Sequence, residues 1–346
     1  EPAPEPAPDS LDNVRQQEMA TQQQADDDAR IREAARRAAK AERDRMEAEE
    51  RKRVAKILDK ARDDLEGKKY GRAAAAYATF IRAADPNKTS THEARLGLAD
   101  SLLGLKLYGN AAEQYHALLE VGAESPYFNS AFNGLRKAAK QISYNPVTLE
   151  ALTNYFVAEK DQSFKDSYNY FVGNFFFDYN RYMEARRYLT EVTSSAADYS
   201  DAQYLLGLIQ VAEAGEDQND PDWPGKIIAA SQFFQNAVTG VNAQKTSRVT
   251  SLSYLALARI AYSVELYDVA IFYYRKVPSD STSYVNALHE SGWSYFLKGD
   301  TRRGMGIFHT LDGPDWKDYF LPDMHLLEAT VFMNACRFDY ANDALK

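Results

Sequence analysis

The strongest constraint on the fold is a spacing of residues that recurs along the chain. A small residue is followed nine positions later by a tyrosine, then three positions later by an alanine, and after four more by a bulky residue. The copies with this spacing are Ala61, Tyr70, Ala73 and Tyr77; Ala99, Tyr108, Ala111 and Tyr115; Gly173, Tyr182, Ala185 and Leu189; and Ala258, Tyr267, Ala270 and Tyr274. Several copies in one register predict an array that grows by stacking one unit on the next.

This spacing resembles the tetratricopeptide repeat, a pair of helices with a period of about 34 residues. The resemblance implies an all-α, right-handed solenoid, in which small residues let the two helices of a pair approach and aromatic rings fill the gaps between pairs. Weaker copies begin at Leu206, Gly292 and Ala329. In the first of these the second helix is delayed, since Ala230, Phe234 and Ala237 come eleven residues later than the spacing predicts. Residues 127–162 have the right length without the signature, so we count them as a degenerate repeat.

We therefore expect about eight helix pairs over residues 53–346, the last incomplete and the array continuing beyond Lys346. Residues 1–10 are rich in proline and alanine and predict an extended tether. Residues 11–66 contain no proline and no glycine before Gly67, which favours one long charged helix with Ser10 as its N-cap. A weak coiled coil, a solvated single helix and a helix that orders on a partner are all compatible with this arm. Only Val54 to Leu65 is apolar enough to pack on the array.

Charge and composition narrow the classes of function. A formal net charge of -9 argues against a nucleic-acid partner, because binding phosphates needs an excess of lysine and arginine. The chain also lacks an apolar run long enough to span a membrane. Cys336 is the single cysteine, so it cannot form an intrachain disulfide, and we expect it to be a small buried residue.

Motifs for catalysis, cofactors or metals are missing from the sequence. It contains no phosphate-binding loop, no His-Glu-x-x-His helix and no Gly-x-Ser-x-Gly elbow. An acidic insert at residues 213–225 contains Glu216, Asp217, Asp220 and Asp222, but Pro221 interrupts it and no glycine stands where a calcium loop turns sharply. We expect a solvated loop there, and we predict a non-enzymatic chain without catalytic residues, cofactor or metal site.

The resemblance also implies a binding surface, since in this family the first helix of each pair lines a concave groove. The groove positions of the array are Tyr170, Asn174, Phe177, Tyr204, Leu208, Arg259, Tyr262, His289, Trp293 and Phe296. Chaperone-binding members hold a carboxylate with lysine and asparagine, and only Asn174 matches that clamp. The largely aromatic set favours an extended peptide or a helix as the bound protein segment. The alternative is that these rings pack against neighbouring helices.

The predicted function is a protein-protein interaction scaffold. The proline-alanine opening, charged helix and repeats resemble periplasmic tetratricopeptide proteins of bacterial envelope machines, including the Tol-Pal division system and myxobacterial gliding motility. That resemblance implies a periplasmic protein whose signal peptide has been removed and whose arm contacts a second partner or another copy. The alternatives are a cytoplasmic regulator or co-chaperone, and the non-catalytic N-terminal part of a larger enzyme.

Overall fold

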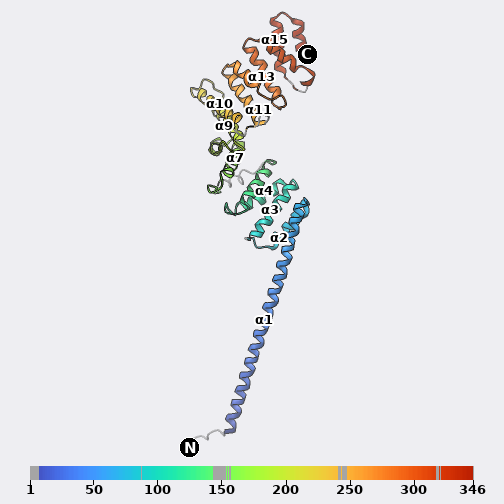
Figure 1. The fold of residues 1–346 in the computed structure, drawn as a ribbon, viewed down its shortest axis with the longest axis vertical. Coiled ribbons are helices and arrows are strands. Elements are labelled where there is room, and N and C mark those ends of the chain that lie inside the picture. The colour runs from blue at the N-terminus through green and yellow to red at the C-terminus, as the bar shows by residue number, and fades with distance from the viewer. Residues whose placement is uncertain are drawn as a thin grey trace. The chain divides into compact units, whose positions relative to one another are not determined.

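The computed structural model describes residues 8–86, 88–142, 157–240, 248–316 and 321–345, together with residues 153, 155, 243 and 319. Over these residues the secondary structure is entirely helical, and consecutive helices pack in adjacent pairs (Figure 1). The predicted all-α array of helix pairs, preceded by a long charged helix, is therefore confirmed.

The chain divides into two compact units, Glu1–Tyr144 and Asn145–Lys346. The helices of the first unit are α1 (Pro8–Glu66), α2 (Tyr70–Ala83), α3 (Thr89–Gly104), α4 (Tyr108–Leu119) and α5 (Phe128–Ala139). The division falls within the degenerate repeat expected at residues 127–162. Its first helix is α5, and most of its second half, including the expected break at residues 144–146, lies outside the described residues.

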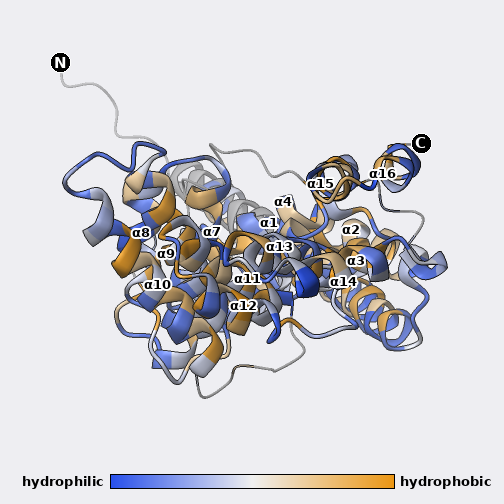
Figure 2. Ribbon diagram, turned by 90° about the horizontal axis from the view of Figure 1, so that it is seen from above, coloured by the Kyte–Doolittle hydropathy of each residue, from blue (hydrophilic) through white to orange (hydrophobic). Residues whose placement is uncertain are grey.

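The second unit contains the remaining pairs. Its helices are α7 (Gln162–Asp178), α8 (Tyr182–Leu189), α9 (Tyr199–Ala214), α10 (Trp223–Thr239), α11 (Arg248–Ser263), α12 (Tyr267–Tyr274), α13 (Tyr284–Leu297), α14 (Thr301–Leu311), α15 (Pro322–Asn334) and α16 (Phe338–Ala344), with a short 3-10 helix at Pro314–Trp316. Hydrophobic and hydrophilic residues occur together on the same helices, as expected of helices that bury one side (Figure 2).

The long helix α1 has two differently placed parts. It begins at Pro8, within the stretch expected to be a tether and before the expected cap Ser10; proline is well suited to a first helical turn. All side chains from residue 32 to residue 53 are exposed, and pairs such as Arg45 with Glu49 lie one turn apart along the helix. The end of α1, by contrast, contributes Leu58 and Ala61 to a core shared with α2 and α3.

Six of the pairs turn from their first to their second helix in the same way. One residue in each turn has a positive φ: Lys68, Lys106, Asn180, Glu265, Gly299 and Cys336. In the second pair, Lys106 N–H donates to the Leu103 carbonyl and Leu107 N–H to the Leu102 carbonyl, and the other five turns repeat both bonds. This double closure is the Schellman motif, which satisfies the last carbonyls of a helix. The second helix starts two residues after the left-handed position in every case.

The environment expected for Cys336 is wrong. The cysteine is exposed, because it occupies the left-handed position of the last turn with φ 57°. A residue at that position lies outside the helix, so its side chain points away from the helix-helix contact. The small, apolar character of cysteine favours burial, but it carries no information about the place of the residue in the turn.

Small residues receive bulky side chains from neighbouring helices. A Cβ on Gly134 of α5 would lie 2.2 Å from the Tyr115 ring of α4, which belongs to the preceding pair. A Cβ on Gly292 of α13 would lie 2.4 Å from the Phe308 ring of α14, within one pair. The array is therefore closely packed both within and between pairs, for the reason the spacing suggested.

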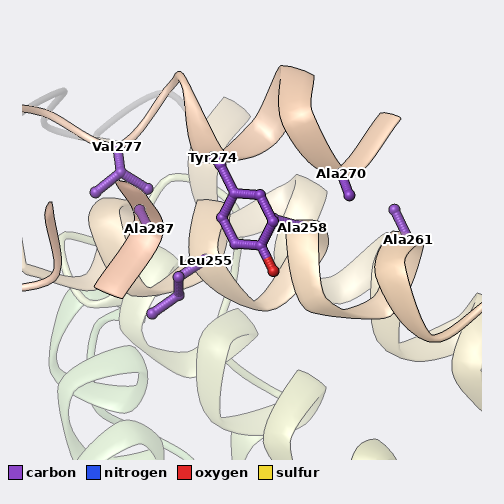
Figure 3. Close-up of a cluster of buried hydrophobic side chains, with 7 residues drawn as sticks. All are labelled: Leu255, Ala258, Ala261, Ala270, Tyr274, Val277 and Ala287. Atoms are coloured by element: carbon purple, nitrogen blue, oxygen red, sulfur yellow. The ribbon is translucent and has the colours of Figure 1, made fainter. Parts of the chain in front are cut away.

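The core consists of local clusters, each formed by neighbouring pairs. In the sixth pair, Tyr274 of α12 lies over Leu255 and Ala258 of α11, with Ala287 of α13 in the same cluster (Figure 3). Each cluster contains residues of adjacent pairs only. The places of the side chains along α9, α11 and α13 therefore depend on how each pair packs on the next.

Candidate partner-binding groove

A cavity of about 430 Å³ lies among α9, α10, α11 and the loop that joins α9 to α10. We call it the groove cavity. Its lining is mainly apolar, with Glu216, Gln218 and Arg259 among the polar members. The lining residues are Tyr204, Leu208, Val211, Gly215, Glu216, Gln218, Trp223, Ile227, Phe234, Leu252, Leu255, Ala256, Arg259, Ile260 and Ser263.

The acidic insert contributes to this cavity. Gly215 ends α9 with φ 71°, a conformation that suits glycine, and α10 starts with Trp223 followed by a proline. Between them the loop holds itself in place: Asp220 Oδ1 accepts from Asp222 N–H at 2.9 Å, and Lys226 Nζ donates to Asp220 Oδ2 at 3.3 Å. The backbone hydrogen bond from Asp222 is the main cause that lowers the pKa of Asp220.

This loop is polar along its exposed side, in agreement with the solvated loop expected there. Its first residues, Gly215 and Glu216, lie against the cavity. In the described part of the chain, no group of three or more His, Cys, Asp or Glu side chains is placed to hold a metal ion. The delay of the second helix thus has a structural consequence, because the extra residues form one wall of the cavity.

Arg259 is held by a network that links the sixth and seventh pairs. Its Nη2 lies 2.6 Å from Glu290 Oε1 and its Nε 2.9 Å from Glu290 Oε2. Tyr274 O–H donates to Glu290 Oε2 at 2.9 Å. The hydrogen bonds with Glu290 raise the pKa of Arg259, and burial raises the pKa of Tyr274. The charge of Arg259 at the cavity rim is therefore already balanced by the Glu290 carboxylate. Apolar contact remains as the main interaction that the cavity can make with a ligand.

Three of the predicted groove residues lie together at this cavity. Tyr204 and Leu208 of α9 are half-buried and line it, as does the exposed Arg259 of α11. The Tyr204 ring lies 5.8 Å from the Phe234 ring, centre to centre, so it packs on α10 while one face lines the cavity. Tyr204, Leu208 and Arg259 are therefore the predicted groove residues that line the groove cavity.

The predicted groove residues of α7 and of the end of α11 contact other residues of their own helix pair. Asn174 Nδ2 donates to Asp178 Oδ2 at 3.3 Å, one turn along α7. The rings of Phe177 and Tyr182 lie 5.8 Å apart. Tyr170 is half-buried on α7, and Tyr262 makes an edge contact with Tyr267 at 5.9 Å.

The predicted residues of α13 lie against the core of the seventh pair. Trp293 packs edge-on against both Phe296 and Phe308. Its Nε1 donates to His289 Nε2 at 3.3 Å, and the same His289 atom lies 3.3 Å from Asp323 Oδ2 of α15. These side chains contribute to packing at least as much as to an open surface, which was the alternative considered for the aromatic set.

Several cavity residues were not among the predicted groove positions. Trp223 and Ile227 belong to the second helix of the fifth pair, and Ile260 lies one residue beyond the predicted Arg259. The signal that could have found them is the eleven-residue delay itself. The extra residues let α10 begin with Trp223, and this helix brings Trp223 and Ile227 to the cavity that it shares with the first helix of the next pair.

Comparisons with known proteins give weak likenesses. No family model matches the sequence, and no curated protein matches it. Among solved structures, the chain is similar to PilF from Pseudomonas aeruginosa, with 15% identity over 77% of this chain and 95% of that chain and a TM-score of 0.36. It is also similar to human IFIT1, in a dimer with PPP-AAAA (13% identity, 84% and 71% covered, TM-score 0.38), and to the apo form of RapI (14%, 84% and 95%, 0.32). At these scores, the assignment of the fold rests on the turns and packing of this chain itself.

Proposed function

We propose that this chain is a non-enzymatic scaffold that binds an extended peptide or a helix of a partner protein at the groove cavity. The observation that carries the proposal is the cavity of about 430 Å³ on α9 and α11, with an apolar lining and a charge-matched rim. Apolar and aromatic pockets of this kind take anchor side chains, which supply most of the binding energy in peptide recognition.

The size of the cavity suits one or two bulky anchors of a longer segment. The remainder of the segment would lie along α9 and α11. The rim polar groups, Glu216, Gln218 and Ser263, supply hydrogen-bonding partners for the backbone of that segment.

The proposal is tested by crosslinking in the native cell. A photoreactive amino acid replaces Val211, which lines the cavity and is 36% exposed. We expect one dominant crosslinked protein, with loss of the crosslink when Leu208→Glu is introduced beside it. The matched control places the same amino acid at Gln232, which is exposed on α10 outside the cavity. Equal crosslinking at both positions, or at neither, contradicts the proposal.

We further propose that the scaffold works in the periplasm as a component of a bacterial envelope machine, in motility, division or outer-membrane assembly. The support is the order of segments: a proline-alanine stretch, a long charged helix, then repeats. Described residues include no helix that is both long and apolar enough to cross a membrane. Fractionation of cells that express the natural gene tests the location, and recovery with the cytoplasmic fraction alone contradicts it.

A further inference from the structure

The outer face of α12 differs from the corresponding faces of other pairs. Val269 and Phe272 point outward and are 41% and 54% exposed. Positions are matched by counting from the left-handed turn residue of each pair. In the first, second, fourth and seventh pairs, the equivalents of Val269 are Arg72, Asn110, Glu184 and Arg303, and those of Phe272 are Ala75, Glu113, Arg187 and Gly306. In the eighth pair they are Tyr340 and Asp343. The position of Phe272 is thus polar or small in all five of these other pairs, and that of Val269 is polar in four of them, with Tyr340 as the exception.

A second apolar cavity, of about 380 Å³, lies beside Val269 among α10, α11 and α12. Its rim includes Ile228, Val264 and Leu266, which are 61%, 39% and 55% exposed. Trp223, Ile227 and Ile260 line both this cavity and the groove cavity, so they lie between the two. Exposed apolar residues grouped around a hollow mark an interaction surface more often than isolated ones do.

A basic cavity of about 500 Å³ lies on the other side of Phe272. Four cations and one carboxylate line it, in a chain whose formal net charge is -9: Arg275, Lys276, Lys298, Arg303 and Asp268. Lys298 pairs with Asp268, and Lys276 Nζ lies 5.1 Å from the centre of the Phe272 ring. The dipole of α12 favours cations just after its end, which accounts for Arg275 and Lys276. It does not account for the cations of the seventh pair.

From these features we infer that the outer face of α12 binds an amphipathic, acidic segment of a partner protein. The α12 surface consists of Ile228, Leu266, Val269, Phe272, Arg275 and Lys276. Apolar side chains of the segment enter the cavity beside Val269, and its carboxylates reach Arg275 and Lys276. Charge complementarity selects this occupant, because an apolar hollow bordered on one side by net positive charge favours a segment with apolar anchors and acidic neighbours. This surface is distinct from the groove cavity, so one array could hold two partners.

The test is selection of peptides from a random 16-residue library displayed on phage, with the full chain as the target. We expect enriched peptides with two apolar residues three or four positions apart and a cluster of Asp and Glu beside them. Synthetic peptide of the enriched sequence should lose at least tenfold in affinity for the double variant Val269→Arg, Phe272→Ala. Both substituted residues occur at the equivalent positions of other pairs, so the fold is expected to tolerate them, and circular dichroism checks this.

Two further variants separate the parts of the proposal. Arg275→Glu with Lys276→Glu should weaken binding and make the remaining affinity less sensitive to salt, since fewer ion pairs form. Arg187→Ala, at the position of Phe272 on α8, is the matched control and should bind as the natural chain does. The proposal is overturned if the enriched peptides lack acidic residues, if none depends on Phe272, or if Phe272→Ala instead abolishes a dimer seen by sedimentation.

Discussion

At the scale of single residues, the array depends on close approaches that only the smallest side chain allows. Gly134 and Gly292 each face an aromatic ring at a distance where a Cβ would clash. Other glycines of the helices, such as Gly306 of α14, have open space around them. Replacement of glycine by alanine should therefore have opposite effects on stability at different positions.

Gly134→Ala should lower the free energy of unfolding by about 1–3 kcal/mol, because the added methyl group displaces the Tyr115 ring from its packed position. Gly306→Ala should raise it by about 0.5–1 kcal/mol through helix propensity, since nothing lies near its Cβ. Chemical denaturation of the two variants measures both effects. A stabilising Gly134→Ala would show that the ring has room to move.

The carboxyl group of Glu328 in α15 should make the free energy of unfolding depend on pH. Burial raises the pKa of this carboxyl, so the folded state favours its protonated form. The stability it contributes is present below the pKa of an unfolded glutamate, about 4.3, and is lost as pH rises through the raised folded pKa. Glu328→Gln should therefore be more stable than the natural chain at pH 7, and this advantage should vanish in acid.

Glu184 offers a control of opposite sign. Its hydrogen bond with Arg181 lowers the pKa of Glu184, so the folded state favours the carboxylate. Glu184→Gln should therefore lose a little stability at pH 7, and the loss should disappear as pH falls through the lowered pKa. Thermal unfolding at a series of pH values compares the variants. The same pH trend in both would contradict the assigned causes.

At the scale of elements, α1 combines a solvated arm with the first helix of a pair. The side chains of residues 32–53 are exposed, whereas Leu58 and Ala61 are buried against α2 and α3. Ion pairs one turn apart, such as Arg37 with Glu33, support the arm. Each exposed pair of this kind contributes only about 0.3–0.5 kcal/mol.

Removal of residues 8–45 should leave the melting temperature of the array unchanged, because the side chains of residues 32–45 are exposed and the core begins only near the end of α1. Leu58→Ala should cost about 2–5 kcal/mol, as it opens a cavity among α1, α2 and α3. Calorimetry of the truncated and substituted chains tests the contrast. A large destabilisation from the truncation would show that the arm packs on the array.

At the scale of the whole molecule, stability is local because each cluster joins adjacent pairs. In the second unit, Phe234 of α10 is fully buried with Ala230 and Leu257, and it packs on Gly207 of α9. Its cluster draws on α9, α10 and α11, with Tyr273 of α12 at its edge. A defect there should weaken these neighbours first.

Phe234→Ala should lower the free energy of unfolding by about 3–5 kcal/mol, because it leaves a cavity in this cluster. Native-state hydrogen exchange should lose protection most in α9, α10 and α11, with a smaller loss in α15 and α16. Met324→Ala in α15, where Met324 is buried, should give the reverse order within the same unit. Equal losses along the unit in both variants would mean that it unfolds as one cooperative block.

The sequence by itself determined the helix pairs, their register and the long charged helix. It could do so because the spacing of Ala61, Tyr70 and Ala73 reflects local rules, namely a turn with one left-handed residue and a small residue facing a ring. The delayed start of α10 was also readable as a displaced second helix.

Only the tertiary structure decided which of these side chains line a cavity. Tyr204 and Leu208 line one, whereas Trp293 packs into a core from an equivalent helix. The difference is that the insert and the start of α10 supply further walls beside α9, namely Gly215, Glu216, Gln218 and Trp223. Burial depends on what the neighbouring pair places opposite a residue, and that contact is absent from the local pattern. Cys336 is exposed for a different, local reason, its left-handed place in the last turn, and the exposure of Phe272 is likewise absent from the spacing.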